Sequence, residues 1–201
     1  MTVSITSIFL ITSISSGVIN MYSSMLKTDG DLIVTQKGIA DTFFSDIETS
    51  SLDNINKIEG VKEVGVMILG ASPVNTLPIV GIYGVSKNRF SEYKLKFGKY
   101  PLNNEVIIGS KINQSLKHPD SVTISKKVYK VSGVFSSDIG FENGGVVMNL
   151  ENAHDLFHKN ASLFLVKLTD LEKSKSIIQQ INSLSSQIET KTTDNFIGTY
   201  N

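Results

Sequence analysis

The chain lacks cysteine and tryptophan altogether, and it has only 3 histidines and 4 prolines among its 201 residues. The absence of cysteine excludes disulfide bonds, thiolate metal ligands and cysteine nucleophiles. Net charge is also absent, because 19 basic residues balance 19 acidic ones. Proteins that bind nucleic acid commonly carry a basic excess or stripe, since neutralising phosphates supplies much of their affinity. We therefore expect no nucleic-acid partner.

What remains is the composition of a folded protein. Hydrophobic residues make up 40% of the chain and charged residues 19%, a balance that allows a buried core and argues against disorder. The length suits one ordinary domain or two small subdomains.

Charge is missing from residues 1–26, and Lys27 is the first charged residue. Roughly twenty helical residues, each rising about 1.5 Å, cross the hydrocarbon core of a bilayer. Residues 1–26 therefore predict a transmembrane helix in contact with lipid. A cleaved signal peptide is one alternative, but it would carry a basic segment before its apolar run. A buried core helix is the other. The missing basic segment also suggests that this helix is truncated at its N-terminus.

Short strands and helices alternate after the uncharged start. Strands are expected at residues 31–36, 61–69, 77–83, 105–108, 121–124, 128–135, 145–149, 163–168 and 187–193. Helices are expected at residues 51–58, 150–157 and 171–184, with Ser51 and Asp170 as caps and Gly60 ending the first. Ile177, Ile178, Ile181 and Leu184 would form the inward stripe of the last helix.

This order of elements predicts an α+β fold with two parts. Residues 27–72 and 146–195 would form a discontinuous, membrane-proximal α/β subdomain. Residues 73–145 would form an inserted, mainly β subdomain, because short strands there are separated by turn-rich stretches.

The histidines offer the first test for a chemical site. His154 and His158 are four residues apart in a predicted helix, a spacing at which two imidazoles can hold zinc. The intervening sequence lacks the glutamate that follows the first histidine in metalloproteases. We favour an exposed helix face, with Leu156 and Phe157 directed to the core.

Other residue types give no stronger signal. The glycine-rich stretch at residues 140–145 matches neither phosphate-binding glycine motif and is expected to be a loop or hairpin. No serine lies in a nucleophile elbow. We therefore expect no catalytic residues, no cofactor-binding site, no cofactor and no metal site.

Several segments follow one another along the chain in an order that can be compared with known families. They are the uncharged start, the strand at 31–36, a helix–glycine–strand passage at 52–64, and the stretches at 80–84, 95–101, 104–109, 128–135 and 146–150. In this order the chain resembles the MacB-type periplasmic core domain of FtsX-like ABC transporter permeases. One departure is that His118, Pro119 and Asp120 stand where the family commonly has a Gly-Asp pair.

The resemblance implies a domain between the first and second of four transmembrane helices. Residues 27–195 would lie on the extracytoplasmic side, periplasmic or extracellular, and residues 196–201 would lead into a second helix. It implies partnership with an ATP-binding cassette ATPase, with a second permease protomer and with an outer adaptor or substrate protein. The domain would be no enzyme itself and would transmit motion driven by ATP hydrolysis in a separate subunit or domain.

Two other functions remain open from the sequence. A membrane-anchored extracytoplasmic sensor would need a real ligand pocket. An anchored enzyme would need a catalytic constellation, which the sequence does not provide.

Overall fold

The computed structural model describes residues 30–39, 41–137 and 142–198. The predicted transmembrane segment, residues 1–26, lies outside the described residues, as do residues 199–201 of the expected lead-in. Within the described ranges, no helix is long and apolar enough to cross a membrane.

Helices and strands alternate along the described chain. The strands are β1 (Leu32–Gln36), β2 (Val61–Val74), β3 (Leu77–Val85), β4 (Leu95–Gly98), β5 (Glu105–Gly109), β6 (Ser121–Ile124), β7 (Lys127–Phe135), β8 (Gly145–Asn149), β9 (Leu163–Leu168) and β10 (Ile188–Thr192). The α-helices are α2 (Leu52–Asn56), α3 (Ser110–Ser115), α4 (Leu150–Phe157), α5 (Ser174–Leu184) and α6 (Thr193–Gly198). Short 3-10 helices are η1 (Thr42–Phe44), η2 (Thr49–Ser51), η3 (Lys87–Glu92), η4 (Glu142–Gly144) and η5 (Leu171–Lys173).

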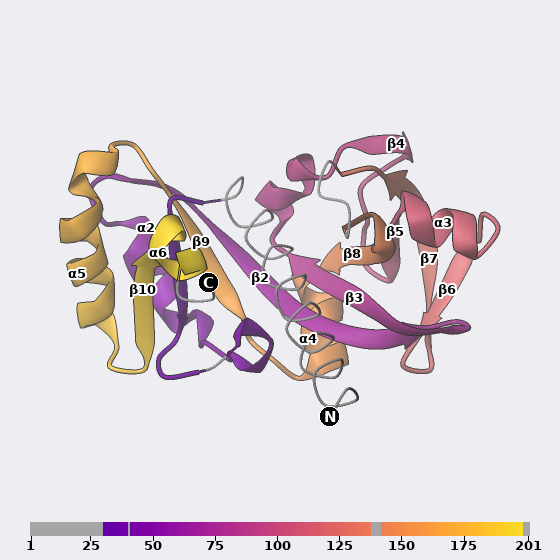
Figure 1. The fold of residues 1–201 in the computed structure, drawn as a ribbon, viewed down its shortest axis with the longest axis horizontal. Helices are drawn as coiled ribbons and strands as arrows, with labels where there is room; N and C mark the ends of the chain where they lie inside the picture. Colours follow the sequence, from indigo (N-terminus) through magenta and orange to yellow (C-terminus); the bar gives the residue numbers. More distant parts are fainter. Residues whose placement is uncertain (1–29, 40, 138–141, 199–201) are drawn as a thin grey trace, which may run out of the picture.

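These strands join into one sheet in the order β10-β1-β9-β2-β3-β8-β5-β7-β4, with β6 pairing β2 and β7. The β3–β8 and β5–β7 pairs are parallel, and the other pairs are antiparallel. Figure 1 shows α5 and β10 at one end of the molecule and the β6–β7 hairpin at the other. The result is a sheet-rich mixture of helix and strand, as the sequence predicts.

Strand β2 connects the two ends. It has 14 residues and spans roughly 45 Å at about 3.3 Å per residue. Its first half pairs with β9, from Val61 to Met67, and its second half pairs with β3, from Met67 to Val74. The sequence predicts only residues 61–69, and the strand is longer because residues 70–74 continue along β3.

Both faces of the sheet are covered. Helices α2 and α5 pack on one end through Ile55, Ile177 and Ile181. Helix α4 packs against β2 and β3. Adjacent residues of β2 enter different core clusters, Met67 one and Ile68 another, because successive strand side chains point to opposite faces.

Several predicted boundaries are confirmed to the residue, namely those of β6, β8, α4 and β9. Asp170 is also confirmed as a cap, because its Oδ1 accepts a hydrogen bond from the Glu172 N–H at 2.9 Å. The first turn it caps is the 3-10 helix η5, before α5 begins.

Two predictions about helix ends are wrong. Ser51 makes no capping bond, because it already has helical backbone angles at the end of η2, whereas a cap needs an extended backbone. Leu184 is 39% exposed, because it is the last residue of α5 and projects beyond the buried stripe.

Candidate functional site

The two ends of the described chain are fastened to each other. The Thr193 hydroxyl donates a hydrogen bond to the Gly30 carbonyl at 2.6 Å, and the Thr193 N–H donates to the Asp31 carbonyl at 3.0 Å. The Asp31 carboxylate accepts from the Leu168 N–H at 2.7 Å. Strands β1, β9 and β10 therefore hold the entrance and exit of the domain side by side.

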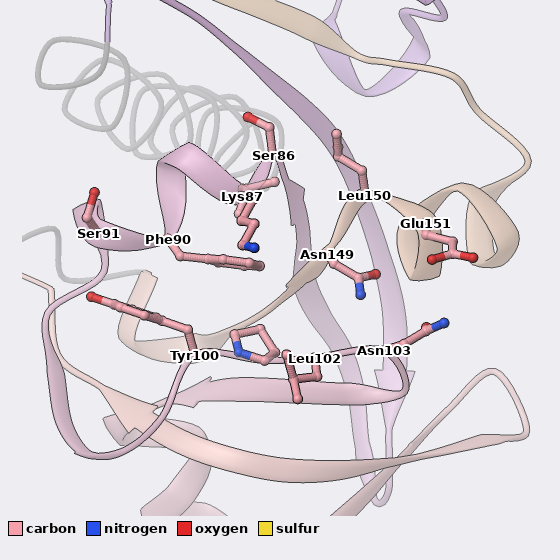
Figure 2. A pocket seen from close by; sticks show the side chains of 12 residues that line it. Ser86, Lys87, Phe90, Ser91, Tyr100, Leu102, Asn103, Asn149, Leu150 and Glu151 are labelled. Carbon is pink, nitrogen blue, oxygen red and sulfur yellow. The ribbon is translucent and has the colours of Figure 1, made fainter.

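A pocket of about 690 Å³ lies beside the C-terminal ends of β3 and β8. Its walls come from η3, from the loop before β5 and from the junction of β8 with α4 (Figure 2). The lining residues are Val85, Ser86, Lys87, Phe90, Ser91, Tyr100, Pro101, Leu102, Asn103, Asn149, Leu150 and Glu151. These segments are far apart in sequence, and β8 brings Asn149 to the others by pairing in parallel with β3.

One wall of the pocket is an aromatic stack. The Phe90 and Tyr100 rings are 5.9 Å apart between centroids, with 13° between their planes. Phe90 is buried in a core cluster, and the Tyr100 hydroxyl donates to the Tyr93 carbonyl at 3.3 Å. The wall is therefore held in place by the core and needs no ligand to form.

The uncharged polar side chains of the pocket include two amides, Asn103 and Asn149, and two serine hydroxyls, Ser86 and Ser91. Asn149 Oδ1 accepts from the Asn152 N–H at 2.8 Å, and Asn103 Oδ1 accepts from the Asn104 N–H at 3.0 Å. Within the described part of the chain, neither Nδ2 group donates a hydrogen bond. Lys87 and Glu151 place one charge of each sign at the same pocket.

The histidine pair predicted on one helical face does not form. His154 is exposed, and its Nδ1 donates to the Lys159 carbonyl at 2.7 Å. His158 follows the last turn of α4 with a left-handed backbone, φ 54° and ψ 41°, which removes it from the helical face. Leu156 and Phe157 pack against the core, as expected. In the described ranges, no group of three His, Asp or Glu side chains could hold a metal ion.

The carboxylates beside helix α2, Asp53 and Glu59, lie at the surface. Glu59 forms an exposed ion pair with Lys173 at 3.0 Å. The Lys173 ammonium lowers the pKa of Glu59, through its hydrogen bond and its charge. Of the glycine-rich stretch at residues 140–145, residues 140–141 lie outside the described residues, residues 142–144 form η4, and Gly145 begins β8.

The sequence does not reveal the pocket. Phe90 and the 95–101 turn stand out only as parts of a family-like order, and nothing local links them to Asn149. Their common signal is two aromatic residues and a proline in a turn-rich stretch, which is too general to predict a pocket.

Solved structures share this fold. The periplasmic region of MacB from Actinobacillus actinomycetemcomitans aligns with a TM-score of 0.68 at 14% identity, covering 87% of this chain and 94% of that one. The extracellular domain of YknZ, a noncanonic ABC-type transporter from Gram-positive bacteria, aligns with a TM-score of 0.65 at 11% identity, covering 80% of this chain and 99% of that one. By sequence, no curated protein matches the chain.

The class defined by these features is the extracytoplasmic domain of a membrane-anchored ABC transporter permease. The sequence matches the MacB-like periplasmic core domain over residues 1–184, and the chain belongs to that family. The family resemblance noted from the sequence is thereby confirmed. MacB-like ABC transporter permeases form dimers and work with a cytoplasmic ATPase. The chain is the periplasmic or extracellular domain of such a permease.

Proposed function

We propose that the domain transmits motion from the membrane helices of the permease to an outer partner or to a transported substrate. Hydrolysis of ATP on the cytoplasmic side would change the spacing of the helices that enter and leave the domain. The domain would move in response as one body and do its work outside the membrane.

The observation that carries this proposal is the clamp between the chain ends. Gly30 and Asp31 at the entrance are hydrogen-bonded to Thr193 at the exit. The strands joined there, β1 and β9, connect through β2 to the far end of the sheet. Because interstrand hydrogen bonds and two covered faces resist bending, a displacement at the clamp would move the far end as well.

We further propose the division expected from the sequence, with residues 27–72 and 146–195 near the membrane and residues 73–145 inserted above. The position of α2, α5 and β10 around the clamp supports the membrane-proximal part (Figure 1). Strand β8 lies between β3 and β5 in the sheet. Hydrogen bonds between strands therefore join the inserted part to the rest, in addition to the two points where the chain passes between them.

The test is to measure two distances in the full-length permease with its ATPase in lipid nanodiscs. The described domain is free of cysteine, so labels can be added at Gln179 on α5 and at Ile79 on β3, both of which are exposed. Pulsed electron spin resonance would give the Gln179–Ile79 distance within a protomer and the Ile79–Ile79 distance between protomers. We expect the distance between protomers to change on ATP binding while the internal distance stays constant.

The matched control is a permease with its ATPase inactivated, in which neither distance should change during incubation with ATP. An unchanged distance between protomers in the active transporter would contradict the proposal. An internal change as large as the change between protomers would contradict rigid transmission.

The membrane-anchored sensor is the second candidate, and the pocket beside Phe90 and Tyr100 favours it. A sensor would be triggered by occupancy of that pocket, whereas a transmitting domain would be driven from the membrane side. Ligand-dependent movement without the ATPase would support the sensor.

A further inference from the structure

We propose that the pocket between η3 and α4 binds a neutral peptide segment of a partner polypeptide. One aromatic or large aliphatic side chain would enter against the Phe90–Tyr100 stack, and backbone carbonyls would accept hydrogen bonds from Asn103 and Asn149. This inference goes beyond the transmitting role and does not depend on it.

The size and wall of the pocket are those of a preformed binding site. Its volume of about 690 Å³ lies within the range of ordinary ligand pockets, roughly 300–1,000 Å³. The Phe90–Tyr100 stack is fixed by burial of Phe90 and by the bond from Tyr100 to the Tyr93 carbonyl. Little conformational entropy would therefore be lost in ordering the site when a ligand binds, which favours affinity.

Apolar surface is left exposed at the same place. Leu102 has 62% of its surface exposed and Tyr100 has 37%, although both line the pocket. In Figure 2 the Tyr100 and Leu102 side chains lie below the Phe90 ring. An entering apolar side chain would remove both from water, which is the main source of favourable free energy in such contacts.

The amides specify the polar part of the ligand. Since both Oδ1 atoms already accept backbone hydrogen bonds, each side chain is oriented to donate through Nδ2. Figure 2 shows the Asn149 nitrogen turned toward the loop that carries Leu102 and Asn103. Two donors beside an apolar wall match carbonyl oxygens of a peptide backbone.

A peptide suits this pocket better than a compact small molecule. The pocket is open-sided, whereas small-molecule sites enclose most of the ligand. A peptide needs to bury only one side chain and can lay its backbone along the rim. Lys87 and Glu151 cancel in charge, so the segment that binds here should be neutral.

The test uses the absence of tryptophan from the chain. The 201-residue chain in nanodiscs would be titrated with N-acetyl-Ala-Trp-Ala-amide, with empty nanodiscs as the blank, and the tryptophan emission recorded. We expect a saturable blue shift, because the indole enters an apolar pocket. N-acetyl-Ala-Ser-Ala-amide should not displace the probe.

Two variants and one control separate the pocket from the rest of the surface. Leu102→Glu should weaken binding by about tenfold, through lost apolar contact and an added charge. Asn103→Ala should weaken it by about fivefold, through one lost hydrogen bond. Val128→Glu is the control, because Val128 is also 62% exposed but lies on β7 away from the pocket lining, and it should leave binding unchanged.

Three outcomes would overturn the inference. They are the absence of saturable binding, equal weakening by Val128→Glu and Leu102→Glu, and undiminished binding by Leu102→Glu. Binding of 3-methylindole as tightly as the tripeptide would overturn the peptide part, because it would show that the backbone carbonyls add nothing.

Discussion

At Gly84 of β3, helix α4 lies in close contact with the sheet. A Cβ placed on Gly84 would lie 2.1 Å from the Cβ of Ala153 and 3.3 Å from that of Ile68. Neither neighbour is a flexible side chain that could turn away. Gly84→Ala should therefore destabilise the domain by about 2 kcal/mol through overpacking.

The same contact provides its own control. Ala153→Gly removes the methyl group that meets the new Cβ, at a cost of about 1 kcal/mol for a glycine within a helix. The double variant should lose only about 1 kcal/mol, less than the sum of the two single changes. Urea unfolding of all four proteins would give the coupling free energy, and strict additivity would refute the contact.

The raised pKa of Tyr83 predicts how the stability of the domain changes at alkaline pH. Burial raises the pKa of Tyr83, and the negative charge of Glu142 raises it further. In the unfolded chain a tyrosine ionises near pH 10. Above that pH the unfolded state loses a proton that the folded state keeps, so the free energy of unfolding falls as pH rises.

Tyr83→Phe removes this contribution. We expect the variant to lose stability less steeply above about pH 10, by up to about 1.4 kcal/mol per pH unit. Urea unfolding between pH 7 and pH 12 would give both slopes, with the pH 7 value as the baseline. Equal slopes for the variant and the wild type would show that Tyr83 ionises alike in both states.

At the scale of elements, the apolar stripe of α5 contains both a buried and an exposed residue. Ile181 is fully buried in the cluster formed with β1 and β9, whereas Leu184 is 39% exposed. Ile181→Ala should cost about 3 kcal/mol, because it leaves a cavity. Leu184→Ala, the matched change one turn later, should cost less than about 0.5 kcal/mol. Urea midpoints would measure both, and comparable losses would contradict the burial difference.

Elements that are long or apolar on both faces are predictable from the sequence. Strands β8 and β9 are near-continuous apolar runs because both sheet faces are covered, and their limits are correct. Strand β4 is missed because it has four residues at the edge of the sheet, mostly exposed. Helix α3 has six residues, too few to show a helical period.

The pocket depends on pairings that no local pattern encodes. Asn149 faces the Phe90–Tyr100 wall only because β8 lies beside β3. Paired residues of these two strands, such as Val85 and Asn149, are 64 positions apart in the sequence. The left-handed His158 is a second such case, because a helical spacing of four assumes that the helix continues.

At the scale of the whole molecule, the single sheet predicts that the domain unfolds as one cooperative unit. Strand β2 belongs to both ends, pairing with β9 and then with β3, and Leu150 packs against two of the core clusters. Disruption at one end should therefore propagate to the other, even though the proposed subdomains are distinct in sequence. A domain that transmits displacement needs this property.

Tryptophan probes at opposite ends would test that expectation. Leu184→Trp reports on α5 and Phe97→Trp on β4, and both positions are exposed, at 39% and 56%. In a chain without other tryptophans, each variant carries a single probe. We expect the two probes to give the same urea midpoint, and Ile181→Ala to lower both midpoints equally although Ile181 lies at only one end. A midpoint at β4 that does not respond to Ile181→Ala would show that the ends unfold independently, and the rigid connection through β2 would then be wrong.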